Sequence, residues 1–266
     1  MTASTQHPHV LMTNDDGIEA RGLHMLADTL QPEADVSVVA PCTERSATGH
    51  GISLLKDLQL ETFHRNGTFW GWKLDGTPAD CVKVAVLMLS KDRPYDLVIS
   101  GINPGVNAGL NILYSGTVAA AREAALLGVP AMAVSLYYTD PNNQPFETAA
   151  RVALDAYRIV RRRGLPRGII LNINVPPVAY EALRGWRVTR MGDSFYSDLF
   201  VHQPGQEEIA TGTYRNVGDR WRPSQGEGED LDDRVLNEGY VSVTPMQFDL
   251  TAHAFLPHLH AWFNEE

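Results

Sequence analysis

The sequence predicts an α/β protein: a Rossmann-like, doubly wound and mostly parallel sheet with a β-rich C-terminal extension. Over roughly the first 185 residues, short apolar runs rich in β-branched residues alternate with segments of helical periodicity. Beyond that point the alternation stops, and short β-like runs lie between polar stretches. We therefore predict a Rossmann-like α/β domain at residues 1–185. An extension at residues 186–266 would serve oligomer contacts.

The first βαβ unit fits into about 40 residues. Val10–Thr13 is predicted as a short buried strand, and the Asn-Asp-Asp-Gly turn signal follows it. Val36–Ala40 is a second strand, bounded by Pro41. Between the strands, apolar residues recur on one helix face before Pro32: Leu23, Leu26, Ala27 and Leu30. A strand, a helix and a strand at this spacing imply parallel pairing.

The same pattern continues along the chain. Thr77 before Pro78, with an acid at position 80, is a helix start. A later helix ends at Gly128 and Pro130. The remaining predicted elements of this domain are a strand at residues 97–100, that helix at 117–127, and strands at 131–135 and 169–174.

The extension lacks this alternation of strands and helices. Residues 208–214 and 240–244 are β-like, and the chain closes with a predicted helix. The glycine-rich acidic stretch at residues 226–233 is predicted to be a solvated loop.

Composition and charge exclude several classes of protein. The net charge of -10 would repel a polyanion, so we expect no extended nucleic-acid partner. No run reaches the ~18 apolar residues of a membrane span, and Met1–His9 is too polar for a signal peptide, so we expect no membrane association and a cytoplasmic location. Cys42 and Cys81 have no metal-ligand spacing and are predicted to be small buried residues of a reducing compartment.

Polar residues follow three of the predicted strands, at the sheet edge where ligands bind in such folds. Asp15 and Asp16 follow the first strand, Ser46 lies in the loop after the second, and the loop at residues 101–109 follows the third. Carboxylate, hydroxyl and amide oxygens suit Mg²⁺, Mn²⁺ or Ca²⁺ better than zinc. The alternative interpretation is a plain Asx turn with a helix cap.

The segment Tyr114-Ser115-Gly116-Thr117 opens a predicted helix. Free backbone N–H groups and the helix dipole make such a start an anion site, although Ser115 or Thr117 serving as an ordinary N-cap is the alternative. The glycine spacing of the 101–109 loop matches neither a dinucleotide fingerprint nor a P-loop, which argues against a Rossmann oxidoreductase. A carboxylate pair and an anion site on one sheet edge predict a metal–phosphate site.

Seven ordered segments resemble SurE, the stationary-phase survival protein family. They cover nearly the whole chain: residues 13–17, 39–41 with Ser46, 76–81, 100–107, 114–121, 172–176, and 239–245 with 249–251.

The resemblance implies a phosphomonoester hydrolase that acts on nucleoside 5'- and 3'-monophosphates and forms dimers or tetramers. It also implies one divalent cation, Mg²⁺ or Mn²⁺, in each subunit. The family's metal ligands correspond to Asp15, Asp16, Ser46 and Asn103, and its phosphate-contacting residues to Asn107, Ser115, Gly116 and Thr117. The two aspartates are the candidate catalytic bases, with the choice between them left open. One departure is Ala47, where many relatives have glycine.

Two alternatives stay open within this interpretation: a phosphatase for short polyphosphate or other phosphomonoesters, and a non-catalytic nucleotide sensor. The intact ligand set argues against the sensor, which needs no metal. His24, His50 and His253 are predicted to be structural residues.

Overall fold

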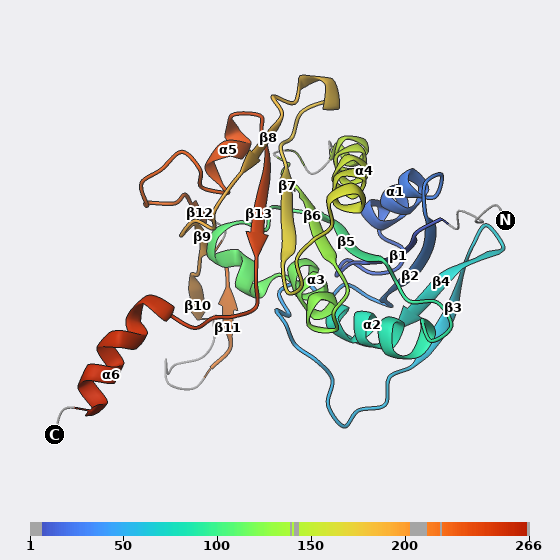
Figure 1. Ribbon diagram of the computed structural model, residues 1–266, viewed down its shortest axis with the longest axis horizontal. Coiled ribbons are helices and arrows are strands. Elements are labelled where there is room, and N and C mark those ends of the chain that lie inside the picture. Colours follow the sequence, from blue (N-terminus) through green and yellow to red (C-terminus); the bar gives the residue numbers. More distant parts are fainter. Residues whose placement is uncertain (1–6, 139, 141–143, 203–211, 219, 265–266) are drawn as a thin grey trace.

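The computed structural model describes residues 7–138, 140, 144–202, 212–218 and 220–264. A nine-stranded sheet in the order β3-β4-β2-β1-β5-β6-β7-β13-β8 forms its centre, with helices on both faces (Figure 1). The five central strands run parallel and confirm the predicted doubly wound arrangement. They are β1 His9–Thr13, β2 Asp35–Pro41, β5 Leu97–Pro104, β6 Ala131–Leu136 and β7 Ile170–Val175.

Two helix pairs cover the sheet. On one face, α1 (Arg21–Leu30) packs against α4 (Phe146–Arg163), whose Tyr157 is among the largest fully buried side chains. On the other, α2 (Pro78–Val84) packs against α3 (Gly116–Leu126), and the π-helical turn η1 (Ala85–Leu89) extends α2. Each pair closes its own hydrophobic core. Burying one large apolar side chain contributes about 1.5–3 kcal/mol.

Small residues let these helices approach the sheet closely. A Cβ at Gly22 of α1 would lie 2.1 Å from the carbonyl oxygen of Ile102, so only glycine fits there. Helix α3 presents five buried alanines to its surroundings: Ala119, Ala120, Ala121, Ala124 and Ala125. The close approach of α3 brings its N-terminus to the carboxyl ends of the central strands.

A β-hairpin that the sequence analysis did not predict extends the sheet beyond β2. Strands β3 (Leu60–Arg65) and β4 (Thr68–Leu74) are antiparallel, and β4 pairs with β2 in parallel. Asn66 and Gly67 both have positive φ, at 52° and 78°, as a two-residue hairpin turn requires.

The C-terminal extension adds two strands to the other side of the sheet. Strand β13 (Val241–Met246) lies antiparallel to β7, and β8 (Trp186–Val188) lies parallel to β13. The predicted β-like run at residues 240–244 is thus confirmed. The main sheet continues across residue 185, the predicted domain boundary.

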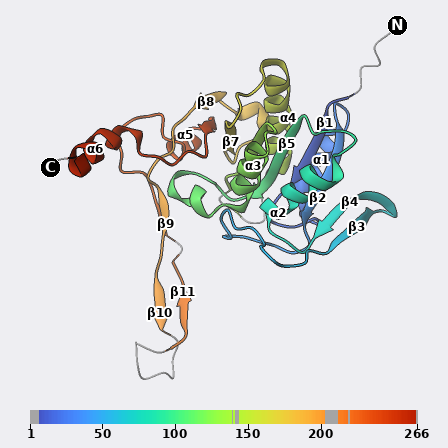
Figure 2. The same cartoon turned by 60° about the horizontal axis from the view of Figure 1, so that its bottom comes forward.

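The chain that connects β8 to β13 in the sequence forms a two-stranded arm, which projects from the body (Figure 2). At its base, β9 (Phe195–Ser197) pairs with β12 (Arg220–Arg222), and farther out β10 (Phe200–His202) pairs with β11 (Tyr214–Asn216). The predicted run at residues 208–214 lies mostly outside the described residues, and Tyr214 at its end begins β11.

Helix α5 (Arg234–Asn237) follows the arm, and α6 (Leu256–Asn264) ends the described chain as the predicted final helix. Single 3-10 turns complete the fold: η2 Gly109–Tyr114, η3 Tyr180–Ala182 and η4 His253–Phe255. Within the described ranges, no helix has the length and apolar character needed to cross a membrane.

The acidic stretch at residues 226–233 is only partly the solvated loop that its composition predicts. Residues 226–230 are exposed, but Asp232 and Asp233 are buried. The Asp232 carboxylate accepts hydrogen bonds from the backbone N–H groups of Gly109 and Gly192, both at 3.0 Å. The prediction is wrong for these two residues because buried loop N–H groups need an acceptor, and the carboxylates provide it.

Candidate active site

The turn after β1 is an Asx turn built by Asn14. Its side-chain amide donates to the carbonyl oxygen of Gly17 at 3.0 Å and accepts from the Gly17 N–H at 3.2 Å. Gly17 has φ of +104°, which favours glycine. Asn14 makes the side-chain hydrogen bonds of the turn, so the turn needs neither the Asp15 nor the Asp16 carboxylate. Both carboxylates can therefore contribute to a binding site.

Asp15 lies at the N-terminus of α3. Its Oδ1 accepts a 2.5 Å hydrogen bond from the Thr117 hydroxyl, and a Cβ at Gly116 would lie 2.9 Å from its Oδ2. Burial raises the pKa of Asp15, although hydrogen bonds from the hydroxyl and backbone N–H of Thr117 act in the opposite direction. The positive end of the α3 dipole thus faces a protein carboxylate.

Asp16 is half-buried and has an unused acceptor. Its Oδ2 is buried and has no hydrogen-bond partner among the described residues. Burial, with the nearby charges of Asp15 and Glu44, raises the pKa of Asp16 to about 7. A buried oxygen of this kind is costly unless a proton or a cation satisfies it.

Ser46 lies in the loop after β2, beside the aspartate turn. The Arg45 N–H donates to the backbone oxygen of Asp15 at 2.7 Å, which ties the loop to the turn. Ser46 is exposed, and its hydroxyl donates to Glu44 Oε1 at 2.6 Å. The next residue, Ala47, has φ of +57°, a region that favours glycine. Alanine is therefore strained at this position.

Asn103 and Asn107 occupy the loop after β5. The Asn103 side-chain NH₂ donates to the carbonyl oxygen of Gly105 at 2.7 Å, which leaves its amide oxygen as the acceptor toward a ligand. Asn107 is buried, and its side-chain NH₂ donates to Ser135 Oγ at 2.8 Å. Its backbone N–H donates to Asn174 Oδ1, and its carbonyl oxygen accepts from Asn172 and Asn174. Asn107 is thus fixed to β6 and β7.

The start of α3 combines capping with ligand-binding capacity. Ser115 is the N-cap, since its Oγ accepts from the Val118 N–H at 3.1 Å. Its hydroxyl hydrogen stays available to a ligand. Thr117, in contrast, commits its hydroxyl hydrogen to Asp15. Ser115 is therefore the N-cap of the alternative interpretation, and the group at the helix start in this structure is the Asp15 carboxylate. Phosphate binding at this segment stays a prediction.

A buried ion cluster that the sequence analysis did not assemble supports the Ser46 loop. Glu123 of α3 contacts His50 Nε2 at 2.9 Å and Lys83 Nζ at 2.7 Å. Burial raises the pKa of Glu123, but these two partners outweigh it, and the net pKa lies below the usual value. The loop is also held at Ser53, whose N–H and hydroxyl both donate to Asp80 of the α2 capping box.

His24 and His253 each contact a neighbouring group of the protein, and one cysteine does not fit its prediction. His24 Nε2 contacts the carbonyl oxygen of Ile18 at 2.9 Å, and its ring packs edge-on against Trp70. His253 pairs with Asp249 at 2.8 Å. Cys81 is buried, but Cys42 is exposed because it lies just past the end of β2.

The donor set fits a hard divalent cation. Asp15 and Asp16 bring carboxylates, and Ser46 and Asn103 bring neutral oxygens on adjacent loops. Carboxylate, hydroxyl and amide oxygens are the ligands that Mg²⁺, Mn²⁺ and Ca²⁺ prefer. The unsatisfied Asp16 Oδ2 is the atom that a cation would satisfy.

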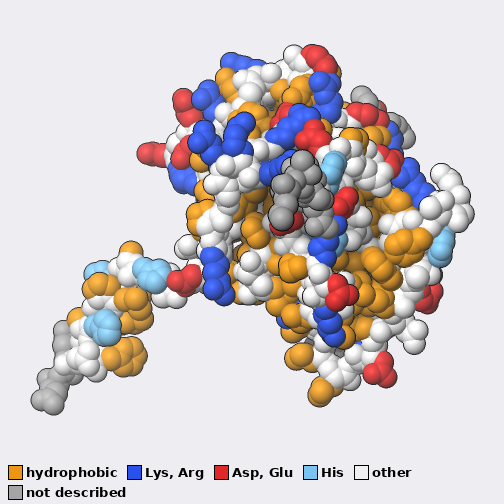
Figure 3. Space-filling view, turned by 45° about the vertical axis from the view of Figure 1, so that its right-hand side comes forward, with side chains coloured by type: hydrophobic (Ala, Val, Ile, Leu, Met, Phe, Trp, Pro, Cys, Tyr) orange, Lys and Arg blue, Asp and Glu red, His pale blue; other side chains and the backbone are white. Residues whose placement is uncertain are grey.

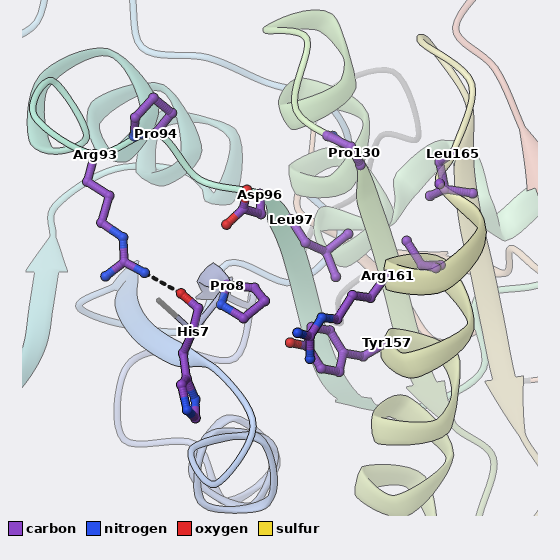
Figure 4. Close-up of a pocket in the computed structure, with 12 residues that line it drawn as sticks. His7, Pro8, Arg93, Pro94, Asp96, Leu97, Pro130, Tyr157, Arg161 and Leu165 are labelled. Atoms are coloured by element: carbon purple, nitrogen blue, oxygen red, sulfur yellow. Dashed lines mark hydrogen bonds between the residues drawn. The ribbon is translucent and has the colours of Figure 1, made fainter. Parts of the chain in front are cut away.

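A large cavity lies at the opposite edge of the sheet (Figure 4). Its volume is about 640 Å³, and Pro8, Leu97 and Pro130 line it where strands β1, β5 and β6 begin. Arg93 and Arg161 lie on opposite sides of it, and Arg93 pairs with Asp35 at 2.7 Å. Ligands of parallel sheets bind at the carboxyl ends of the strands, so this cavity is separate from the candidate site.

Comparison with known proteins shows which family the chain belongs to. The sequence model described as "Survival protein SurE" matches residues 10–198, which include every candidate site residue. The chain belongs to the SurE family. The relative named 5'-nucleotidase SurE from Desulfatibacillum aliphaticivorans is 44% identical over 258 residues and covers 96% of this chain and 98% of its own.

Further SurE relatives agree across nearly the full length. The protein of the same name from Chlorobaculum tepidum is 39% identical over 98% of this chain. The crystal structure of SurE from Aquifex aeolicus superposes with a TM-score of 0.82 at 32% identity, covering 97% of this chain and 100% of that one. The SurE match therefore includes the arm and the C-terminal strands as well as the parallel sheet.

Proposed function

We propose that this chain is a metal-dependent nucleotidase that hydrolyses nucleoside 5'- and 3'-monophosphates to nucleoside and phosphate. The observation that carries the proposal is the buried, unsatisfied Oδ2 of Asp16 beside Asp15 at the N-terminus of α3. Two adjacent carboxylates with raised pKa values form a site that lacks positive charge. The 5'-nucleotidase names of the SurE relatives support the substrate class.

One divalent cation per subunit, Mg²⁺ or Mn²⁺, would be held by Asp15, Asp16, Ser46 and Asn103. When bound, it supplies charge neutralisation for the phosphoryl group and a lowered pKa for water. The α3 hydrogen bond from Thr117 fixes the orientation of the Asp15 carboxylate, and one carboxylate of the pair accepts the proton of the attacking water.

The phosphoryl group would lie between the start of α3 and the loop after β5. Ser115 offers its hydroxyl hydrogen, Gly116 leaves room beside Asp15, and Asn107 is fixed in place by β6 and β7. The Thr117 hydroxyl donates to Asp15 and so contributes by holding that carboxylate in place. Donors fixed in advance stabilise developing negative charge without reorganisation during the reaction.

We also infer a homodimer or homotetramer. Helix α6 stands away from the body and carries exposed hydrophobic and histidine side chains (Figure 3). Trp262 is 64% exposed and Phe263 83% exposed. Exposed apolar side chains gathered on a projecting helix mark a protein contact. Light scattering should give a mass of two or four times 29.3 kDa, and a monomeric mass would contradict the inference.

Phosphate release from a panel of nucleoside monophosphates and short polyphosphate, with and without Mg²⁺ or Mn²⁺, tests the proposed activity. We expect phosphate release from the nucleotides to depend on the metal. Asp15→Asn and Asp16→Asn should each abolish this release. The matched control is Asp96→Asn, because Asp96 accepts the His9 N–H at the opposite sheet edge. Release from polyphosphate alone would favour the polyphosphatase alternative. Folded protein without any release would refute the nucleotidase and favour the sensor.

A further inference from the structure

A second, smaller cavity lies between the loop after β5 and the base of the arm. Its volume is about 140 Å³. Three aromatic side chains line it, Tyr137, Tyr196 and Trp221. The other lining residues are Val106, Asp233 and the α5 residues Leu236 and Asn237. Pockets for whole small ligands usually measure about 300–1,000 Å³, so this one accommodates part of a ligand.

The cavity adjoins the proposed phosphate site. Val106 directly precedes Asn107 in the chain, and Tyr137 follows β6 two residues after Ser135, the partner of the Asn107 side chain. The Tyr137 N–H donates to the carbonyl oxygen of Val175 at the end of β7. The cavity and the phosphate donors therefore share the carboxyl ends of the same strands, whereas the cavity of about 640 Å³ lies at the other end.

Two of the aromatic side chains at the cavity contact each other edge to face. Tyr196 and Trp221 are directly opposite each other on β9 and β12, with ring centroids 5.1 Å apart and an interplanar angle of 69°. Burial, with Tyr137 and Tyr138 nearby, raises the pKa of Tyr196, which places all three tyrosines in one neighbourhood. Aromatic side chains bind nucleobases by stacking because every base has a π-face.

The base of the arm is fixed against the loop that precedes α3. Leu110 N–H donates to the carbonyl oxygen of Ser194 at 2.8 Å, and Tyr196 N–H donates to Asn111 Oδ1 at 3.2 Å. The buried Asp232 carboxylate joins this loop to the start of the arm through its two glycine N–H contacts. These contacts hold Tyr196 and Trp221 in a constant position relative to Asn107, as a specificity site requires.

We infer that this cavity is the nucleobase subsite of the enzyme. The base of a nucleoside monophosphate stacks on the ring of Trp221, and Tyr196, which is inclined at 69° to Trp221, borders the base. The edge of the base lies toward the Asn237 amide, a group that both donates and accepts hydrogen bonds. The ribose spans from the cavity to the phosphoryl group beside Asn107. The inference rests on the proposed function, because it assigns the base of the same substrate.

The test compares one substrate with a base and one without. Trp221→Ala should lower kcat/KM for AMP about tenfold or more, and leave kcat/KM for ribose 5-phosphate within about twofold of the unaltered enzyme. Trp221→Phe should retain most of the AMP activity. Phe195→Ala is the matched control, because Phe195 neighbours Tyr196 on the same strand, is exposed, and does not line the cavity. It should affect neither substrate.

An equal loss with both substrates would show a structural role for Trp221, and an unchanged kcat/KM for AMP would place the base elsewhere. Either result overturns the inference. Adenosine binding, followed by tryptophan fluorescence, separates this inference from the hydrolytic activity. Adenosine should quench the unaltered protein more than Trp221→Phe. If no substrate is hydrolysed, that difference still supports the subsite, and its absence refutes the subsite.

Discussion

Replacing Asp16 by asparagine should stabilise the metal-free protein at alkaline pH. The pKa of Asp16 is raised from 3.8 to about 7. Each pKa unit corresponds to about 1.36 kcal/mol, so ionised Asp16 costs the folded state about 4 kcal/mol. Because the folded pKa is the higher one, the favourable contribution of protonated Asp16 is complete below pH 3.8 and is lost as the pH rises through 7. The asparagine side chain of the variant would carry no charge at either pH.

The assay is urea unfolding in EDTA at about pH 5 and about pH 8. We expect Asp16→Asn to raise the free energy of unfolding by about 4 kcal/mol at the higher pH. At the lower pH the gain should be less than half of that, because folded Asp16 is protonated there while the unfolded carboxyl, with a pKa of 3.8, is already ionised. Mg²⁺ or Mn²⁺ should remove the advantage of the variant, because a cation that binds only the folded unaltered protein adds about 4.1 kcal/mol at roughly 1,000 times its Kd. Destabilisation of the metal-free variant at the higher pH, or an effect independent of pH, would refute the reasoning.

Three further predictions follow from the geometry of the site. Thr117→Val removes the hydroxyl that donates to Asp15 and should lower the rate of phosphate release about tenfold or more. Thr117→Ser keeps a hydroxyl and should retain the activity; a fully active Thr117→Val variant would contradict the prediction. Ala47→Gly should raise the free energy of unfolding by about 0.5–1 kcal/mol in urea, since φ of +57° strains alanine; a loss of stability would show that the loop tolerates alanine. Glu123→Gln should cost about 2 kcal/mol at about pH 7. That cost should diminish as the pH falls below 4.5, because stability from a lowered carboxyl pKa is present above the unfolded value and is lost as the pH falls through the folded one.

The parallel part of the fold could be predicted from the sequence because each strand is a short buried run between polar turns. The hairpin β3–β4 was missed, although Asn66-Gly67 is the strongest short signal for such a turn. Its strands lack a clean apolar alternation, since one face contacts solvent through residues such as Phe69. Local turn chemistry would have found it where periodicity did not.

Only those residues of the candidate site that directly follow a strand could be predicted from the sequence. Asp15 and Asp16 follow a strand directly, so topology alone brings them to the ligand-binding edge. The contact of Thr117 with Asp15 joins residues 102 positions apart, and that of His50 with Glu123 joins residues 73 apart. No local pattern encodes such pairs, because they depend on how α3 packs against the sheet.

The order of strands in the sheet also bears on how the chain folds as it is synthesised. Strand β13 fills the place between β7 and β8, yet about 65 residues of chain separate β13 from β7. At roughly 5–20 residues per second, a nascent chain would display the open edge of β7 for several seconds before β13 covers it. An uncovered edge strand is a template for association with other chains. A translation product that stops before Val241 would therefore retain the candidate site residues and still be prone to aggregate.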